Sequence, residues 1–132
     1  MAVAVVVDDN EDELQQAVLS LKSTRQFEAV YGFTCPEVAY CLMKERGIDV
    51  LFMEVEMKGL NCFVLMDRLR KIGRDILYVI MTSNDGYACE AFQKGIADYV
   101  LKPLTAEGAA KTLEKLRKYH KREKNTYCND TG

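Results

Sequence analysis

Three carboxylates come directly after apolar segments of this chain. Asp8 and Asp9 follow the run Val3–Val7, and Glu54 follows the run Val50–Met53. Clustered carboxylate oxygens are the hard ligands that a divalent cation such as Mg²⁺ takes, usually with water and phosphate oxygens in the remaining positions. A bare phosphate would be repelled, because the first loop is acidic and lacks the glycines that present backbone N–H groups to an anion. These residues predict chemistry that a cation assists.

A hydroxyl and an ammonium group come after two further apolar segments. Thr82 follows Ile76–Met81, and Lys102 follows Ala97–Leu101. In open α/β sheets the carboxyl ends of parallel strands meet at one edge, and ligands bind where the strand order switches. If these segments are parallel strands, the hydroxyl and the ammonium line the same shallow crevice as the carboxylates.

The segments that must position these groups alternate in type. The apolar runs are typical of buried parallel strands, and the more polar run Phe27–Phe33 predicts a strand nearer an edge. Apolar residues at helical spacing predict helices over about residues 11–21, 36–46, 63–72, 87–94 and 105–116. Short connections favour right-handed crossovers. The sequence therefore predicts an α/β fold, a doubly wound (βα)5 unit with a five-stranded parallel sheet and helices on both faces.

Composition limits the class of protein. A chain of 132 residues with 48% hydrophobic and 29% charged residues fits one ordinary soluble domain. No apolar run approaches the roughly 20 residues of a membrane span, and the five cysteines lack CxxC spacing, so we expect no membrane partner and a cytoplasmic location. Residues 111–124 carry seven basic and two acidic side chains, whereas the preceding body is acidic, which argues against a nucleic-acid-binding core.

Taken together, the residues resemble the receiver domains of bacterial two-component response regulators, up to about Lys118. The resemblance rests on the acidic pair, on Glu54 and Thr82 at their strand ends, on Tyr99 in the fifth strand and on the dipeptide Lys102-Pro103. The stretches EVEMKGLNCF and GYACEAFQKGIADYVLKP resemble receivers joined to LytTR-type DNA-binding domains. The resemblance implies a flavodoxin-like receiver with strand order 2-1-3-4-5 over residues 1–120, and a basic and polar tail or linker over residues 121–132.

The resemblance also implies a metal site. In the family, the residue at the end of the third strand is an aspartate that accepts a phosphoryl group from a histidine kinase. Mg²⁺ is held there by the acidic pair, here Asp8 and Asp9, by the acceptor, here Glu54, and by the backbone carbonyl two residues on, here that of Glu56. We therefore expect Mg²⁺ as a possible cofactor, whose binding is weakened because Glu54 replaces the aspartate.

The same resemblance assigns a catalytic pair and a switch. Lys102 and Thr82 would engage phosphoryl oxygens, and Tyr99 would rotate inward when Thr82 moves. The usual proline and glycine of the loop after the third strand are replaced by Lys58 and Cys62, so the shape of that loop is not implied.

Glu54 departs from the family pattern. Its extra methylene carries the carboxylate about 1.5 Å further than aspartate would, and a misplacement of that size can slow an in-line transfer about 100-fold. One hypothesis is that Glu54 imitates the phosphorylated state and biases the switch formed by Thr82 and Tyr99. A second is that Glu54 forms an inert ion pair with Lys102. A third is that phosphorylation is retained.

These inferences favour a signalling module rather than an enzyme: an atypical receiver that acts without phosphorylation. The face made by the fourth helix, the fifth strand and the last helix would bind a partner protein or a second copy, and DNA would be reached only through an output domain absent from these residues. One alternative is a Mg²⁺-dependent phosphoacceptor served by a histidine kinase. Another is a flavodoxin-like domain that binds a small ligand, which the acidic, glycine-poor first loop disfavours.

Overall fold

Strands and helices alternate along the chain as the sequence predicts. The computed structural model describes residues 2–131, and the side chains of residues 2–118. The elements are β1 Ala2–Val7, α1 Glu11–Ser23, β2 Phe27–Phe33, α2 Pro36–Glu45, β3 Val50–Met53, α3 Cys62–Lys71, β4 Leu77–Thr82, the 3-10 turn η1 Asp85–Tyr87, α4 Ala88–Gln93, β5 Asp98–Leu101 and α5 Ala106–Thr131.

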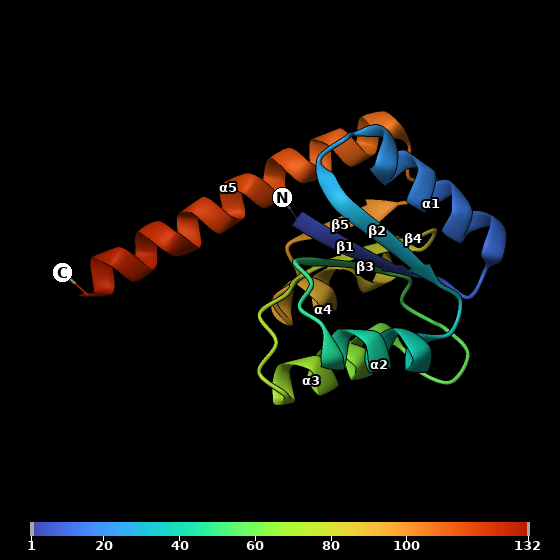
Figure 1. Ribbon diagram of the computed structural model, residues 1–132, viewed down its shortest axis with the longest axis horizontal. Helices are drawn as coiled ribbons and strands as arrows, with labels where there is room; N and C mark the ends of the chain where they lie inside the picture. Colours follow the sequence, from blue (N-terminus) through green and yellow to red (C-terminus); the bar gives the residue numbers. More distant parts are fainter. Residues whose placement is uncertain (1, 132) are drawn as a thin grey trace.

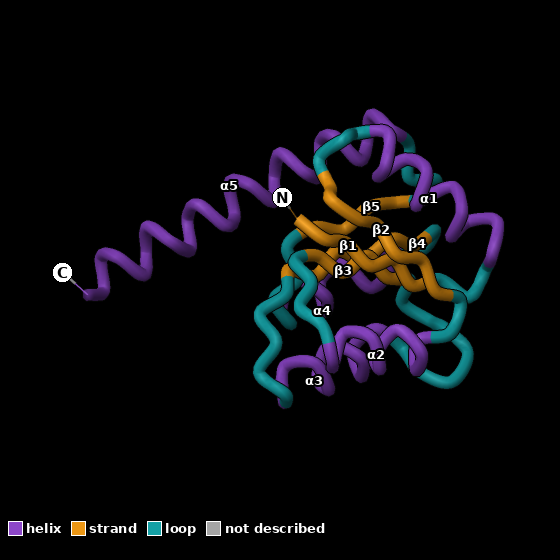
Figure 2. The backbone as a smooth tube through the Cα atoms, in the orientation of Figure 1, coloured by secondary structure: helices purple, strands orange, loops and turns teal. Residues whose placement is uncertain are grey.

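The five strands form one parallel sheet in the order β2-β1-β3-β4-β5 (Figure 2). This confirms the expected order 2-1-3-4-5 and the edge position of β2. The central strand β3 is buried at all four positions, which agrees with its unbroken apolar run. The register fixes where the strands end, because Val7 pairs with Met53 and Met53 pairs with Ile80.

Helices cover both faces of the sheet (Figure 1). On one face α2, α3 and α4 pack against a core that includes Met43, Leu65 and Leu69. On the other face α1 and α5 pack against a second core that includes Leu21 and Phe52. Since side chains alternate across a strand, the nearly continuous apolar sequences of β1 and β3 supply both cores. The doubly wound prediction is therefore confirmed.

The helix ends differ from expectation mainly at the C-terminus. Asn10 caps α1, because its Oδ1 accepts a hydrogen bond from the backbone N–H of Glu13 at 3.0 Å. The last helix was expected to reach about residue 116, but α5 continues to Thr131 and projects away from the sheet (Figure 1). The segment that we expected to be a tail from residue 121 is thus helical up to Thr131. Its separation from the domain stays a prediction. Among residues 2–131, no helix has both the length and the apolar character that a bilayer crossing requires.

Candidate functional site

The ends of three strands bring acidic and basic side chains to one edge of the sheet. Asp8 and Glu54 each follow the last residue of neighbouring strands, since Val7 and Met53 are paired in the β1–β3 register. Lys102 follows Leu101, the last residue of β5, and its backbone N–H donates to the Thr82 carbonyl of β4 at 2.9 Å. The parallel topology therefore gathers groups from positions 8, 54 and 102 of the sequence.

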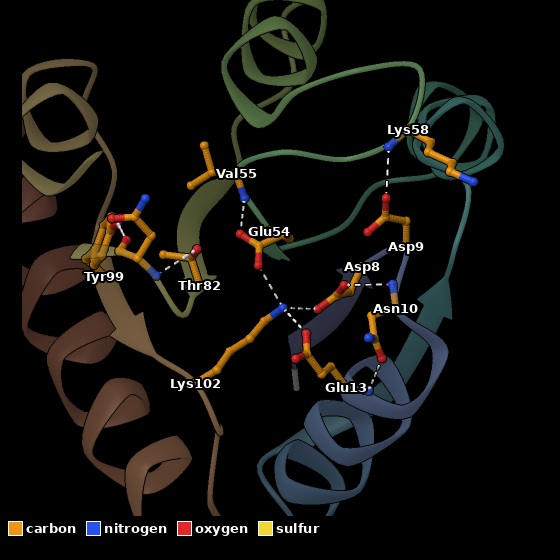
Figure 3. Close-up of polar contacts among 11 residues, drawn as sticks. Asp8, Asp9, Asn10, Glu13, Glu54, Val55, Lys58, Thr82, Tyr99 and Lys102 are labelled. Atoms are coloured by element: carbon orange, nitrogen blue, oxygen red, sulfur yellow. Dashed lines mark hydrogen bonds and ion pairs between the residues drawn. The ribbon is translucent and has the colours of Figure 1, made fainter. Parts of the chain in front are cut away.

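The Lys102 ammonium lies among three carboxylates (Figure 3). Its Nζ is 2.6 Å from Asp8 Oδ2 and 2.8 Å from Glu54 Oε1, and it donates a further hydrogen bond to Glu13 Oε2. The side chains of Lys102, Asp8 and Glu54 are 9%, 1% and 16% exposed. Lys102, Asp8 and Glu54 therefore form a buried group of ions, for which solvent screening is weak, and Glu13 joins it from the more exposed side.

Glu13 belongs to this cluster although the sequence analysis did not select it. It lies in the first turn of α1, where an acidic residue is usually explained by the positive end of the helix dipole. One carboxylate oxygen from each of Asp8, Glu13 and Glu54 lies within 4.8 Å of the other two. A residue three positions after a helix cap at the carboxyl edge of a sheet is the signal that could have identified it.

Asp9 is not part of this cluster. Its Oδ2 accepts a hydrogen bond from the backbone N–H of Lys58 at 2.9 Å, so the side chain points toward the β3–α3 loop (Figure 3). Of the acidic pair that the resemblance assigns to Mg²⁺ together with Glu54, Asp8 lies in the cluster, and the further carboxylate beside Lys102 comes from Glu13. A role of Asp9 in holding a metal stays a prediction.

The loop after β3 is closed by its own contacts. The N–H of Cys62 donates to the Val55 carbonyl at 2.9 Å, and Gly59 adopts a positive φ of 88° that side chains disfavour. The Glu56 carboxylate accepts a hydrogen bond from the Tyr87 hydroxyl at 2.6 Å. That contact uses the side chain of Glu56 and leaves the proposed role of its backbone carbonyl as a prediction.

Thr82 and Tyr99 lie to one side of Glu54, away from Asp8 and Glu13 (Figure 3). The Thr82 side chain is buried, and its Oγ1 accepts a hydrogen bond from the backbone N–H of Asn84 at 3.3 Å. The Tyr99 hydroxyl donates to the Asn84 carbonyl. Both residues of the expected switch therefore hold the same β4–α4 segment, one at each backbone group of Asn84. Their movement stays a prediction.

Burial and charge oppose each other in the cluster. Burial raises the pKa of Asp8 above its ordinary value of 3.8, although Lys102 and the N–H of Asn10 act in the opposite direction. Burial alone would lower the pKa of Lys102, but its contacts with Asp8, Glu13 and Glu54 outweigh burial and raise that pKa. Lys102 is therefore a permanent cation at neutral pH, and the three acids around it are in excess.

The donor set fits a divalent cation. Asp8 Oδ2 is buried, and its partner among the described residues is the Lys102 ammonium at 2.6 Å, so a lone pair remains available to a cation. Carboxylate oxygens of this kind suit Mg²⁺. Asp8, Glu13 and Glu54 would hold the ion, which would neutralise negative charge beside position 54 when phosphoryl oxygens approach. The same carboxylates already contact Lys102, so the ammonium and the ion would compete for them.

Comparison with known proteins connects this geometry to a family. The profile of the response regulator receiver domain matches residues 4–114. The Bacillus subtilis sensory transduction protein LytT is 30% identical over 121 residues, which cover 92% of this chain and 50% of that protein. The Bacillus subtilis transcriptional regulatory protein NatR is 27% identical over 113 residues, covering 86% of this chain and 48% of NatR. The chain thus spans about half the length of these curated relatives.

Solved structures show the same fold. The response regulatory domain of mrkE from Klebsiella pneumoniae superposes with a TM-score of 0.79 at 21% identity, covering 91% of this chain and 98% of that one. The beryllofluoride-activated NtrC4 receiver domain dimer gives a TM-score of 0.77 at 20% identity, covering 90% and 99%. At this level of identity the likeness concerns the fold alone.

Proposed function

The chain belongs to the response regulator receiver domain family, and from this premise we propose that it is a receiver of a two-component system whose site is held by an ion pair between Glu54 and Lys102 and acts without phosphorylation. The observation that carries this proposal is the contact of 2.8 Å between Glu54 Oε1 and Lys102 Nζ, inside a cluster that is largely closed to solvent. In the family the equivalent lysine engages a phosphoryl group, whereas here a side-chain carboxylate already occupies it.

Both oxygens of Glu54 have partners. Oε1 contacts Lys102, and Oε2 accepts a hydrogen bond from the backbone N–H of Val55 at 2.6 Å. Charge-assisted hydrogen bonds of this length are stronger than neutral ones. A phosphoryl donor would have to displace the Lys102 contact before the carboxylate could attack, and the carboxylate is also one methylene further out than an aspartate. Both effects oppose transfer to Glu54.

The contacts also bear on the choice between imitation and inert pairing. Among the described side chains, Glu54 reaches Lys102, while the Thr82 hydroxyl accepts from Asn84 instead. We therefore propose that Glu54 reproduces the lysine contact of a phosphorylated receiver but leaves Thr82 outside it. The site would then be fixed in one state, and a partner would read that state without a kinase.

An interaction surface for such a partner is the face of α4, β5 and α5. Phe92 of α4 and Leu101 of β5 are each more than half exposed, at 52% and 53%. Large apolar side chains that remain exposed support binding to a protein partner or to a second copy of the chain. Two relatives are described as regulatory or sensory transduction proteins, so we propose control of transcription through a partner or a further domain.

The decisive experiment compares the natural protein with Glu54→Asp. Each protein is incubated with Mg²⁺ and an acyl phosphate, then analysed by intact mass, and with beryllofluoride, then analysed for oligomeric state. In the natural chain we expect no phosphoryl adduct and no change of oligomeric state. In Glu54→Asp we expect both the adduct and the change. A phosphoryl adduct mapped to Glu54 that turns over in the natural chain would refute the proposal.

One observation favours a second candidate, a Mg²⁺-dependent phosphoacceptor served by a histidine kinase. Each of the three carboxylates of the cluster offers one oxygen within 4.8 Å of the other two, and such oxygens are suitable ligands for the ion. This candidate predicts the adduct at Glu54 that the first excludes. No observation favours a flavodoxin-like domain for a small ligand, and tight binding of flavin or nucleotide would be needed to support it.

A further inference from the structure

The position of Glu13 in α1 would normally give it another partner. Asn10 caps the helix and Glu13 stands three residues later, which is the spacing of a capping box. In that motif the glutamate side chain turns back to the backbone N–H of the cap residue. Here the N–H of Asn10 donates to Asp8 Oδ1 at 3.0 Å, so the carboxylate of Glu13 is released from the helix end.

The released carboxylate reaches across to the last strand. Glu13 Oε2 accepts a hydrogen bond from Lys102 Nζ, and the two residues are 89 positions apart in the sequence (Figure 3). The backbone of Glu13 is fixed by the cap, because its N–H donates to Asn10 Oδ1 at 3.0 Å. The chain from Asp8 through Asn10 to Glu13 is therefore a continuous set of hydrogen bonds that aims one side chain at the ammonium.

We propose that Glu13 is a positioning residue for Lys102, one that occupies the third donor of its ammonium and so competes with any phosphoryl oxygen that approaches the site. This proposal goes beyond the family pattern, which assigns no role to this position, and it rests on the proposed function only in taking Lys102 as the counter-ion of position 54. It holds whether or not Glu54 itself accepts a phosphoryl group.

The donor count supports this competition. A lysine ammonium has three N–H donors and no acceptor. Asp8, Glu13 and Glu54 supply three carboxylates within contact distance of Nζ. A phosphoryl oxygen can therefore engage Lys102 only by replacing one of them, or by sharing a donor at longer distance.

Exposure identifies Glu13 as the replaceable partner. Its side chain is 42% exposed, whereas those of Asp8 and Glu54 are 1% and 16% exposed. Glu13 can thus move into solvent at little cost, while the other two carboxylates cannot. It also lines a cavity of about 180 Å³ beside Lys102, together with Gln16, Ser83 and Pro103. That space would accommodate Glu13 when it leaves the ammonium.

The first test uses single substitutions that keep Glu54. Removing the charge in Glu13→Gln weakens one contact of the ammonium and admits water, so we expect exchange of the Lys102 ammonium protons with solvent, measured by NMR, to accelerate about tenfold. Glu11→Gln is the matched control, because Glu11 is an exposed acid in the same first turn but lines the groove beside Val30 and Gly32 of β2. Equal exchange rates in the two variants would overturn the proposal.

A second measurement tests the competition itself. In the Glu54→Asp background, with Mg²⁺ at a concentration that saturates each variant, we expect Glu13→Gln to tighten beryllofluoride binding about five- to tenfold, and Glu11→Gln to change it less than about twofold. Weaker binding in the Glu13 variant, or an equal gain in the Glu11 variant, would contradict the proposal. A phosphoryl adduct on Glu54 of the natural chain would refute the proposed function separately. In that case the exchange of the Lys102 ammonium protons still tests the role of Glu13.

Discussion

Two regions of the molecule each bury an aspartate beside a lysine, and they differ in charge balance. At the carboxyl edge, Asp8 shares Lys102 with Glu13 and Glu54. Between β5 and α5, Asp98 is 5% exposed. It accepts a hydrogen bond from the Thr112 hydroxyl at 2.8 Å and one from the Lys115 ammonium at 3.4 Å. We call the first group the Lys102 cluster and the second the Asp98 cluster.

This difference in charge balance distinguishes a binding site from a structural contact. In the Asp98 cluster one carboxylate meets one hydroxyl and one partly solvated lysine, so its charge and its hydrogen bonds are balanced. In the Lys102 cluster three carboxylates meet one ammonium, and the raised pKa of Asp8 shows that its charged form is disfavoured there by burial. An excess of like charge lowers stability and persists where a ligand, metal or partner compensates it.

The largest expected effect comes from removing the shared cation. Lys102→Met leaves Asp8 and Glu54 buried without a counter-ion, and breaking a buried ion pair typically costs about 3–5 kcal/mol. We expect that loss in the free energy of unfolding, measured by urea denaturation in EDTA. Mg²⁺ in hundredfold excess over its Kd should return up to about 2.7 kcal/mol to this variant, because the ion fits the carboxylates that Lys102 leaves.

The matched control is Lys115→Met in the Asp98 cluster. The Lys115 side chain is 65% exposed, so its pair with Asp98 is screened by solvent and should contribute less than about 1 kcal/mol. Mg²⁺ should not stabilise this variant. Equal losses in the two variants would show that the two clusters do not differ as we argue.

The sequence predicted the Lys102 cluster in outline because its residues follow apolar strands. Strand runs that end abruptly at Asp8, Glu54 and Lys102 are visible as pattern, and parallel topology then brings the strand ends together. The edge position of β2 follows from its more polar sequence, and the strand order follows from the resemblance to receivers; the structure confirms both. The structure also places Glu54 Oε1 2.8 Å from Lys102 Nζ, the contact that one of the three hypotheses for Glu54 contained.

The remaining features depend on side-chain choices that no periodicity records. Asp9 and Glu13 are both acids near the end of β1, yet Asp9 binds the Lys58 N–H and Glu13 binds Lys102. The competition among local hydrogen-bond donors at the helix cap decides which of the two acids contacts Lys102. The length of α5 was also missed, because its polar sequence beyond residue 118 has no apolar stripe that predicts where the helix ends.

An intermediate effect is expected in the Asp98 cluster. Thr112→Val keeps the shape of the buried side chain but removes the hydroxyl that donates to Asp98 Oδ2. Hydrogen bonds to charged groups contribute about 1.5–3 kcal/mol, so we expect a loss of that size in the free energy of unfolding. Thr112→Ser, which retains the donor, should recover most of it. A loss below about 0.5 kcal/mol in Thr112→Val would mean that Asp98 is solvated rather than held by α5.

The smallest expected effect is that of Asp8→Asn, and its sign should be opposite to that of the matching change in the Asp98 cluster. Asp98→Asn should destabilise the protein, since it weakens two satisfied hydrogen bonds of a balanced cluster. Asp8→Asn should stabilise it at neutral pH, on the order of 1 kcal/mol, because it removes one of three like charges while Glu13 and Glu54 still neutralise Lys102. Denaturation midpoints at pH 7 would reveal the opposite signs.

The pH dependence of Asp8→Asn follows from the raised pKa of Asp8. An acid whose pKa is higher in the folded state contributes stability that is full below its unfolded value of 3.8 and is lost as pH rises through its folded value. The amide that replaces Asp8 in this variant has no proton to lose, so the advantage of Asp8→Asn should be near zero at low pH and should grow as pH rises through that window. Urea denaturation over the acid to neutral range measures it. An advantage that shrinks with rising pH would show that Lys102 outweighs burial at Asp8, and the contrast between the two clusters would fail at its central residue.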